Sequence, residues 1–268
     1  MPEVDSLFRS IASSLAEAWA GQSGPTASDA GSGPRPGDKR VAACPVLPLQ
    51  GVTLLVVEDS RFACEALRLM AQRSGARMRR AATLRDARRH LDVYRPDAVL
   101  VDMGLPDGSG SGLIRDLVVS QSPLVVLGMS GDPGQRSVAL AAGAFGFIEK
   151  PLSGLAAFQS VLLRHLPGHG AAVSSADAVP EPDMLALTDD LLSVARMLDA
   201  SPDAAQRSYI AGFLGGVARS AHDAPLEAAA RSLHGADGDA VMALSGMVAR
   251  RLGGARGAFD QTAHPNGD

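Results

Sequence analysis

The sequence predicts a doubly wound α/β domain with a five-stranded parallel sheet, followed by a small all-α domain. Two observations lead to this fold class. Between residues 51 and 167, short apolar runs alternate with amphipathic segments, which is typical of parallel strands covered by helices on both faces. From residue 184 to residue 253, apolar residues recur at helical spacing with no strand pattern between them.

Five short runs are the candidate strands of the sheet, and an amphipathic segment follows each of them. The runs are Thr53–Val57, Arg77–Ala81, Ala98–Val101, Leu124–Met129 and Gly146–Ile148. The predicted helices are Phe62–Ser74, Thr83–Val93, Leu113–Val119, Gln135–Ala142 and Leu155–Leu166. Proline and glycine residues divide the C-terminal region into four further helices.

The remaining segments are expected to extend or connect these two domains. Residues 1–20 form an amphipathic helix with Trp19 as a candidate anchor, and this helix packs either on its own domain or on a partner. Residues 21–50 and 168–183 are linkers, because they are rich in small and polar residues and poor in apolar surface. Residues 254–268 are expected to be a disordered tail.

The bulk composition favours a globular cytoplasmic protein that is not inserted in a membrane. Of 268 residues, 46% are hydrophobic, and the formal net charge is −4, so no global positive field attracts nucleic acid. The two cysteines form no CxxC pair, which fits a reducing compartment. No signal-peptide pattern and no apolar run of about 20 residues is present.

Reactive side chains stand at the carboxyl ends of four of the five predicted strands. Glu58 and Asp59 follow the first strand, Asp102 the third, Ser130 the fourth and Lys150 the fifth. Ligands of open α/β sheets bind beyond the carboxyl ends of the strands. We therefore expect these five side chains to meet in one crevice.

These residue types fit the chemistry of phosphoryl transfer. Neighbouring carboxylates repel one another unless a hard cation such as Mg²⁺ lies between them. Asp102 can then attack phosphorus as a nucleophile and form an acyl phosphate. The Ser130 hydroxyl and the Lys150 ammonium are suitable donors to the oxygens of the transferred group. Each residue alone could be a helix cap, a turn hydroxyl or a surface charge, but their joint order favours a site.

Residues 51–167 resemble the receiver domains of two-component response regulators, which have a flavodoxin-like fold. The matching segments are VVEDS at 56–60, VDMGLPDGSG at 101–110, GMSG at 128–131 and FGFIEKPL at 145–152. The resemblance implies that Asp102 is the phosphoryl acceptor. It also implies that Glu58, Asp59 and Asp102 are metal ligands, together with the backbone carbonyl of Gly104.

The resemblance further implies a cis peptide bond between Lys150 and Pro151. It makes Phe147 a candidate switch residue whose rotamer changes when Ser130 moves toward the phosphoryl group, the alternative being an ordinary core aromatic. The chain departs from the family pattern in its Glu-Asp acidic pair, in a serine where threonine is frequent, and in Gly128. Glycine within the fourth strand lowers strand stability and allows a bulge. None of these departures removes a reactive atom.

The C-terminal helical region carries no diagnostic motif. Residues 181–268 contain seven arginines, no lysine and twelve acidic residues, which argues against a DNA-binding output. Neither His222 nor His234 lies in a sequence suited to a phosphotransfer helix, because a proline or a turn follows closely. The segment Ser208–Gly212 resembles the phosphotransfer motif with its histidine missing, which leaves a non-catalytic version open. A bundle that merely packs against the receiver is a further alternative.

The sequence therefore predicts a response regulator with no enzyme activity beyond the phosphorylation and dephosphorylation chemistry of its receiver. Its expected cofactor is Mg²⁺, and its expected partner is a sensor histidine kinase or a histidine phosphotransfer protein. The expected output is protein–protein interaction, with homodimerisation left open. The main alternative is a receiver-like inhibitor that binds such a kinase or phosphotransfer protein, with phosphorylation secondary. A DNA-binding transcriptional regulator is the least favoured alternative.

Overall fold

The computed structural model describes residues 47–120, 124–166, 168, 183–233 and 238–262. Pro45–Asp268 forms one compact unit. The helix expected at 1–20 and nearly all of both expected linkers lie outside the described residues.

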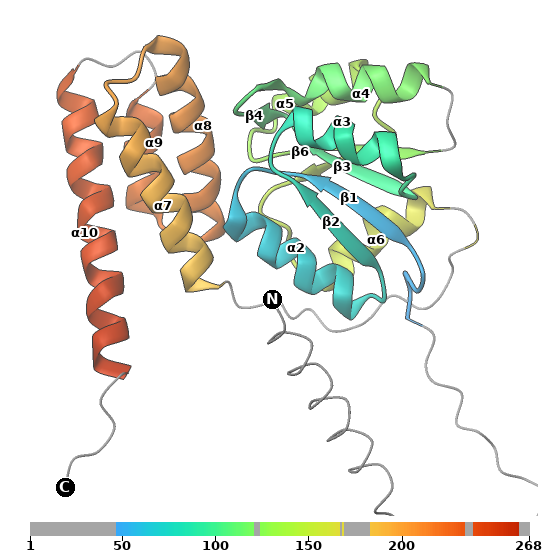
Figure 1. Cartoon of the computed structure of the whole chain (residues 1–268), viewed down its shortest axis with the longest axis horizontal. Helices are drawn as coiled ribbons and strands as arrows, with labels where there is room; N and C mark the ends of the chain where they lie inside the picture. The colour runs from blue at the N-terminus through green and yellow to red at the C-terminus, as the bar shows by residue number, and fades with distance from the viewer. Residues whose placement is uncertain (1–46, 121–123, 167, 169–182, 234–237, 263–268) are drawn as a thin grey trace, which may run out of the picture. The chain divides into compact units, whose positions relative to one another are not determined.

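A five-stranded parallel sheet is the centre of the first region, which confirms the predicted fold class (Figure 1). Every pair of neighbouring strands is parallel. In the order β2-β1-β3-β6-β7, the strands are Arg77–Ala81, Thr53–Val57, Ala98–Asp102, Val125–Ser130 and Gly146–Glu149. The chain runs from β1 outward to β2 and then crosses to β3 on the other side, so the order reverses at β1 and β3. A crevice for ligands opens at such a switch point.

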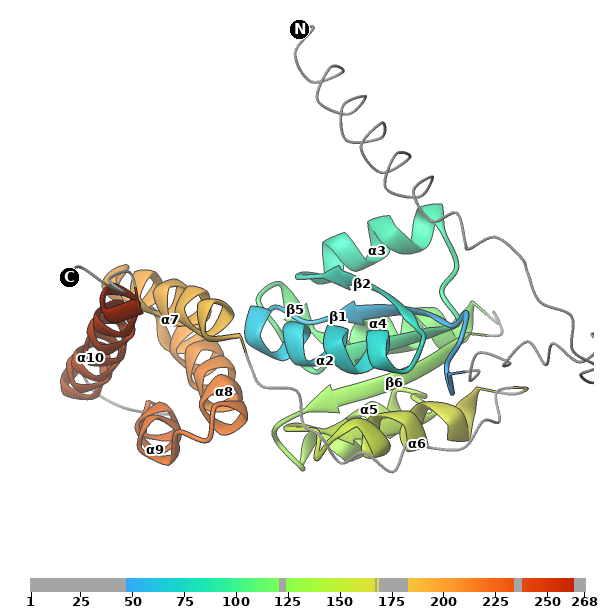
Figure 2. The ribbon, with the colours of Figure 1, turned by 90° about the horizontal axis from the view of Figure 1, so that it is seen from below.

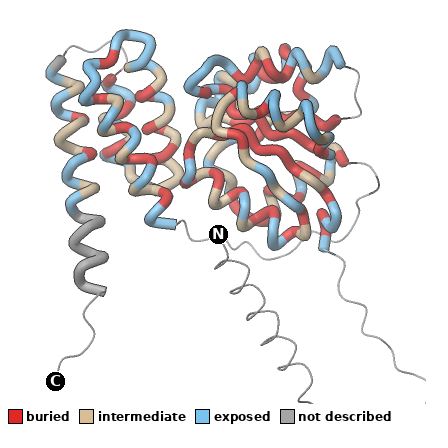
Figure 3. The backbone as a smooth tube through the Cα atoms, in the orientation of Figure 1, coloured by how far each residue is buried: buried red, intermediate tan, exposed pale blue. Residues whose placement is uncertain are grey.

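Five helices cover the two faces of this sheet (Figure 1). They are α2 (Arg61–Arg73), α3 (Leu84–Val93), α4 (Gly110–Val119), α5 (Gln135–Ala141) and α6 (Leu155–His165). Alternate strand residues point to opposite faces: Leu54 and Val56 pack with α2 and α6, whereas Leu55 and Val57 pack with α3, α4 and α5. The three inner strands β1, β3 and β6 are consequently buried along nearly their whole length, whereas the edge strands β2 and β7 are partly exposed (Figure 3). Leu49, within the segment predicted as a linker, is also fully buried, so the domain begins before residue 51.

A short antiparallel hairpin after β3 was not predicted. It consists of β4 (Gly104–Leu105) and β5 (Gly108–Ser109). Its turn carries Asp107, whose carboxylate accepts hydrogen bonds from the backbone N–H groups of Leu84 and Arg85 at 2.9 and 3.0 Å. Asp107 thereby supplements the capping of α3. The hairpin leads directly into α4, which begins at Gly110 rather than at the predicted Leu113.

Gly128 lies in a regular part of β6, so the bulge that glycine allows does not form. It pairs in register with Val101 on one side and Phe147 on the other. A Cβ atom at this position would lie 2.6 Å from the Cβ of Ala139 in α5. Glycine therefore lets α5 approach the sheet closely.

The C-terminal region contains four helices, as predicted, in its described part. They are α7 (Met184–Asp199), α8 (Ala204–Ser220), α9 (Ala224–Ser232) and α10 (Gly238–Thr262). Figure 2 shows α8 beside α9 and α7 beside α10, and contacts between these pairs agree. Their shared core is apolar and includes Val194, Ile210, Leu214 and Val248.

Helix α10 continues to Thr262, so the segment after Gly253 is not a disordered tail throughout. Glycine costs about 1 kcal/mol relative to alanine inside a helix, which is why Gly253 and Gly254 suggested an end. Propagation from an existing helix avoids the cost of nucleation, however, and Val248 anchors the preceding turns in the core. None of the described helices combines the length and the apolar character that a membrane crossing requires.

Candidate functional site

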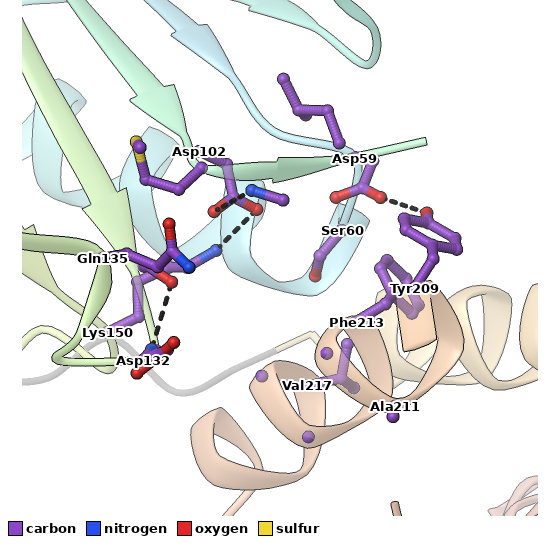
Figure 4. Close-up of a pocket in the computed structure, with 18 of the residues that line it drawn as sticks. Asp59, Ser60, Asp102, Asp132, Gln135, Lys150, Tyr209, Ala211, Phe213 and Val217 are labelled. Carbon is purple, nitrogen blue, oxygen red and sulfur yellow. Dashed lines mark hydrogen bonds and ion pairs between the residues drawn. The ribbon is translucent and has the colours of Figure 1, made fainter. Parts of the chain in front are cut away.

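The predicted site residues meet at the carboxyl edge of the sheet (Figure 4). Glu58 and Asp59 follow β1, Asp102 ends β3, Ser130 ends β6 and Lys150 follows β7. One carboxylate oxygen from each of the three acidic residues lies within 4.8 Å of the others. The sheet topology thus places side chains from distant parts of the sequence in one crevice.

The backbone around Asp102 is closely packed. Asp102 Oδ1 lies 3.5 Å from the backbone nitrogen of Gly104. A Cβ atom at Gly110, at the start of α4, would lie 2.1 Å from the Asp102 carbonyl oxygen, so only glycine fits there. The beginning of α4 therefore rests directly on the end of β3 and limits the backbone positions open to Asp102.

Lys150 connects two of the three carboxylates. Its Nζ lies 2.8 Å from Glu58 Oε2 and 3.1 Å from Asp102 Oδ2. Burial alone would lower the pKa of Lys150, but the neighbouring Asp102 and Glu58 carboxylates raise it overall, so this side chain remains an ammonium. The peptide bond between Lys150 and Pro151 is cis, as the resemblance implies.

The three carboxylates carry more negative charge than Lys150 can balance. Burial raises the pKa of Asp102 to about 6; Lys150 opposes this shift and Glu58 adds to it. Burial also raises the pKa of Asp59 to about 6, against the hydrogen bond from Tyr209 and with a contribution from Asp102. The pKa of Glu58 is raised by burial as well, although Lys150 opposes this. A further positive charge in the crevice would relieve the repulsion.

The donor set fits a hard divalent cation such as Mg²⁺. Asp59 Oδ1 is buried and has no hydrogen-bond partner in the described part of the structure. Both oxygens of Glu58 have partners, Oε1 in the backbone N–H of Ser60 and Oε2 in Lys150. Asp102 is similarly partnered, by the backbone N–H of Gly104 and by Lys150, so we expect Asp59 Oδ1 to provide the most direct metal contact. Gly104 lines the same cavity, and coordination by its carbonyl stays a prediction.

The structure gives the contacts of Ser130 and Phe147 in one state, and their role as switch residues stays a prediction. Ser130 Oγ accepts a hydrogen bond from the backbone N–H of Asp132 at 3.1 Å, within its own loop. Phe147 is half-buried and packs against the layer of α3, α4 and α5. Its ring borders Gly128, where an added Cβ would lie 3.3 Å from Phe147 Cδ2.

The C-terminal helices add side chains to this site that sequence reasoning missed. The Tyr209 hydroxyl of α8 donates a hydrogen bond to Asp59 Oδ2 (Figure 4). Asp190 of α7 accepts a hydrogen bond from Ser60 Oγ at 2.8 Å. Tyr209 lies in the segment that resembles a phosphotransfer motif without histidine, and that resemblance was the one available signal. A cavity of about 750 Å³ is lined by both the sheet edge and α8.

Comparisons with known proteins identify the first region. Residues 54–161 match the family model of the response regulator receiver domain. This segment is a receiver domain. The chain is 34% identical over 122 residues to the KDP operon transcriptional regulatory protein KdpE of Escherichia coli (strain K12), covering 45% of this chain and 54% of that protein. It is 35% identical over 100 residues to the virulence transcriptional regulatory protein PhoP of Salmonella typhi, covering 37% of this chain and 45% of that protein.

A solved structure similar to the receiver is that of the receiver domain of a sensor histidine kinase from Pseudomonas aeruginosa PAO1, which has a magnesium ion coordinated in its active site cleft. Sequence identity is 26%, the match covers 43% of this chain and 98% of that one, and the TM-score is 0.40. The chain spans about half the length of the curated relatives it matches. Because both relatives are named as transcriptional regulators, the comparisons do not support the expectation that nucleic acid is an unlikely partner.

Proposed function

We propose that the receiver accepts a phosphoryl group from a phosphohistidine donor onto Asp102, with Mg²⁺ bound, and that the helical region transmits the signal by protein–protein interaction. The observation that carries this proposal is Asp102 Oδ2 lying 3.1 Å from Lys150 Nζ, within a cluster of three carboxylates. The receiver-domain match supports phosphorelay signalling. The donor would be a sensor histidine kinase or a histidine phosphotransfer protein.

In this reaction an Asp102 carboxylate oxygen forms a bond to phosphorus while the bond from phosphorus to the donor imidazole nitrogen breaks. With a pKa of about 6, Asp102 is mainly ionised at neutral pH and can act as the nucleophile. Bound Mg²⁺ would offset negative charge on the transferred group. Lys150 is placed to donate to a phosphoryl oxygen, and Ser130 could do so after turning from the Asp132 backbone. We propose no further enzyme activity.

Labelling with a small phosphodonor tests this proposal directly. The full chain is incubated with radiolabelled acetyl phosphate and Mg²⁺, alongside Asp102→Asn and the control Asp116→Asn, whose carboxylate is exposed on α4. We expect acid-stable, base-labile label in the wild type and the control, at least about a hundredfold less in Asp102→Asn, and none with EDTA. Equal labelling of Asp102→Asn would exclude Asp102 as the acceptor.

The main alternative is a receiver-like inhibitor that binds a kinase or phosphotransfer protein without needing phosphate. The contact between Tyr209 and Asp59 favours it, because a protein side chain occupies one oxygen of an expected metal ligand. An Asp102→Asn protein that retains full activity in cells would support this alternative. A DNA-binding output would instead produce a salt-sensitive mobility shift with the purified protein, which the acidic C-terminal region makes us expect to be absent. Homodimerisation stays a prediction.

A further inference from the structure

The face of α7 and α8 that touches the receiver is built around a buried carboxylate. Asp190 of α7 is only 3% exposed. Besides the Ser60 hydroxyl, it accepts hydrogen bonds from the backbone N–H groups of Arg61 and Phe62 at 3.0 and 3.1 Å. These groups form the N-terminus of α2, where a negative charge is stabilised by otherwise unpaired N–H donors.

A fully partnered buried carboxylate differs from an incidental surface contact. Burying a charge is costly unless several donors compensate for it, and here three donors from one helix start do so. The adjacent Asp189 gives a contrast, because its ion pair with Arg61 has side chains 48% and 61% exposed. Exposed ion pairs of this kind contribute little to stability. Asp190 is therefore the residue that we expect to anchor α7.

A second contact reaches the metal-binding carboxylates themselves. The Tyr209 hydroxyl donates a hydrogen bond to Asp59 Oδ2. Phe213 lies beside Tyr209, with a distance of 5.9 Å between the ring centroids. The contact from Tyr209 leaves Oδ1 as the oxygen of Asp59 that is open to a metal ion. A hydrogen bond on Oδ2 and a metal ion on Oδ1 draw on the negative charge of the same carboxylate, so each weakens the other.

A third contact lies on the loop that follows β6, across the crevice from Asp59. A Cβ atom at Gly131 would lie 2.4 Å from the Arg219 guanidinium of α8, so Arg219 packs directly on this glycine. Arg219 is also paired with Glu227 at 3.0 Å, which holds it in place. The helical region thus touches loops on both sides of the acceptor and covers the crevice.

We propose that the face formed by Asp190, Tyr209 and Arg219 is a receiver-binding surface that is seated on the acceptor crevice of its own chain and competes with the metal ion there. The cavity of about 750 Å³ leaves room for a small phosphodonor, but α8 forms one of its walls, so a protein donor would reach Asp102 only after α8 moves away. Release of the helical region then precedes phosphorylation by a protein donor. This inference rests on the metal site of the proposed function.

Linkage makes the competition measurable in both directions. If docking weakens Mg²⁺ binding by a certain factor, Mg²⁺ weakens docking by the same factor. Variants that remove docking contacts must therefore bind Mg²⁺ more tightly. In the wild type, Mg²⁺ must weaken the docking of the helical region on the receiver. Neither result requires phosphorylation.

The test is a calorimetric Mg²⁺ titration of the full-length chain and four variants. Asp190→Ala and Tyr209→Phe remove docking contacts, while Asp189→Ala and Tyr94→Phe are the matched controls, the latter changing the only other tyrosine. We expect about tenfold tighter Mg²⁺ binding in the two docking variants and less than about twofold change in the controls. Far-UV circular dichroism should give equal helix content for all five proteins.

Small-angle scattering provides the second measurement. Saturating Mg²⁺ should increase the radius of gyration of the wild type, and Asp190→Ala should already be expanded without it. Unchanged or weaker Mg²⁺ binding in both docking variants would overturn the proposal, as would an absence of binding in all five proteins. If Mg²⁺ binding follows the expected pattern but no protein accepts label from acetyl phosphate, the proposed function fails while the docking proposal stands.

Discussion

The crevice of the receiver that holds Glu58, Asp59, Asp102 and Lys150 and the core of the helical region are both buried, but their chemistry is opposite. The crevice contains three carboxylates and one ammonium, and Asp59 Oδ1 lacks a partner within the described residues. The helical core is made of apolar side chains such as Leu214 and Ile210, both fully buried. Burial therefore stabilises one region and leaves the other dependent on an added charge.

The largest effect is expected from Lys150→Met, which tests whether the crevice depends on its one ammonium. Removing one partner of a buried ion pair costs about 3–5 kcal/mol, because the Glu58 and Asp102 carboxylates lose their counter-charge. Urea unfolding at pH 8 measures the loss. Protonation of the carboxyls should reduce it at pH 5.

An equal loss at pH 5 and pH 8 would show that the Lys150 stem, rather than its charge, stabilises the crevice. Arg68→Met is the control for removal of a cation, since its pair with Glu65 is on the surface and its side chain is 50% exposed. Surface pairs contribute about 0–1 kcal/mol, so we expect a small effect there at both pH values.

The helical core should respond to loss of volume rather than charge. Leu214→Ala in α8 should lower the free energy of unfolding by about 3 kcal/mol, through lost burial and a cavity. Unlike the Lys150 effect, this loss should be the same at pH 5 and pH 8. Met242→Ala is the control because its side chain is 69% exposed, and a comparable loss there would contradict the assignment of the core.

The sequence was informative about the receiver because its signals are local. Short runs of three to six residues, most of them apolar, predict the strands, and a parallel topology places the residues that follow them at one edge of the sheet. The sequence alone therefore assigned one crevice to Glu58, Asp102 and Lys150. The predicted ends of the strands agree with the observed ends to within about one residue, because few strand registers place the apolar residues on the buried faces of the sheet.

The contacts from the helical region could not be predicted in the same way. Asp190 reads as an ordinary polar position on an amphipathic helix, and its burial depends on how α7 meets the N-terminus of α2. Such a contact involves residues 128 to 130 positions apart, with no periodicity linking them. The short hairpin after β3 was missed for another reason: two-residue strands are too short for a pattern.

Asp59→Asn should stabilise the metal-free protein, the reverse of the two changes above. The pKa of Asp59 is about 6 in the folded protein against an ordinary value of 3.8, so the fold favours the protonated form. Stability of the wild type is accordingly lost as pH rises from about 4 through about 6. Asparagine cannot ionise, and at pH 7 the variant should be about 1–3 kcal/mol more stable in EDTA.

Mg²⁺ should narrow this difference in stability. At a hundred times its dissociation constant, a ligand that binds only the folded state adds about 2.7 kcal/mol, and this gain should be smaller in Asp59→Asn. Thermal unfolding in EDTA and in Mg²⁺ at pH 4.5 and pH 7 measures both effects. A wild type that is more stable than the variant in EDTA at pH 7 would show that the crevice carries no electrostatic strain.

The smallest effect is expected from an ion pair that lies outside both the crevice and the helical core. This pair tests whether the energy of an ion pair depends on its burial or on its charges alone. Arg88 of α3 and Asp116 of α4 approach to 3.1 Å, with side chains 52% and 63% exposed. A double-mutant cycle with Arg88→Ala and Asp116→Ala should give a coupling of about 0.2–1 kcal/mol that falls as salt is added. The Lys150–Glu58 pair has a similar distance, 2.8 Å, but Glu58 is 1% exposed. If the coupling energy of the Arg88–Asp116 pair were as large as that of the Lys150–Glu58 pair, the distance between the charges, and not their desolvation, would set both coupling energies.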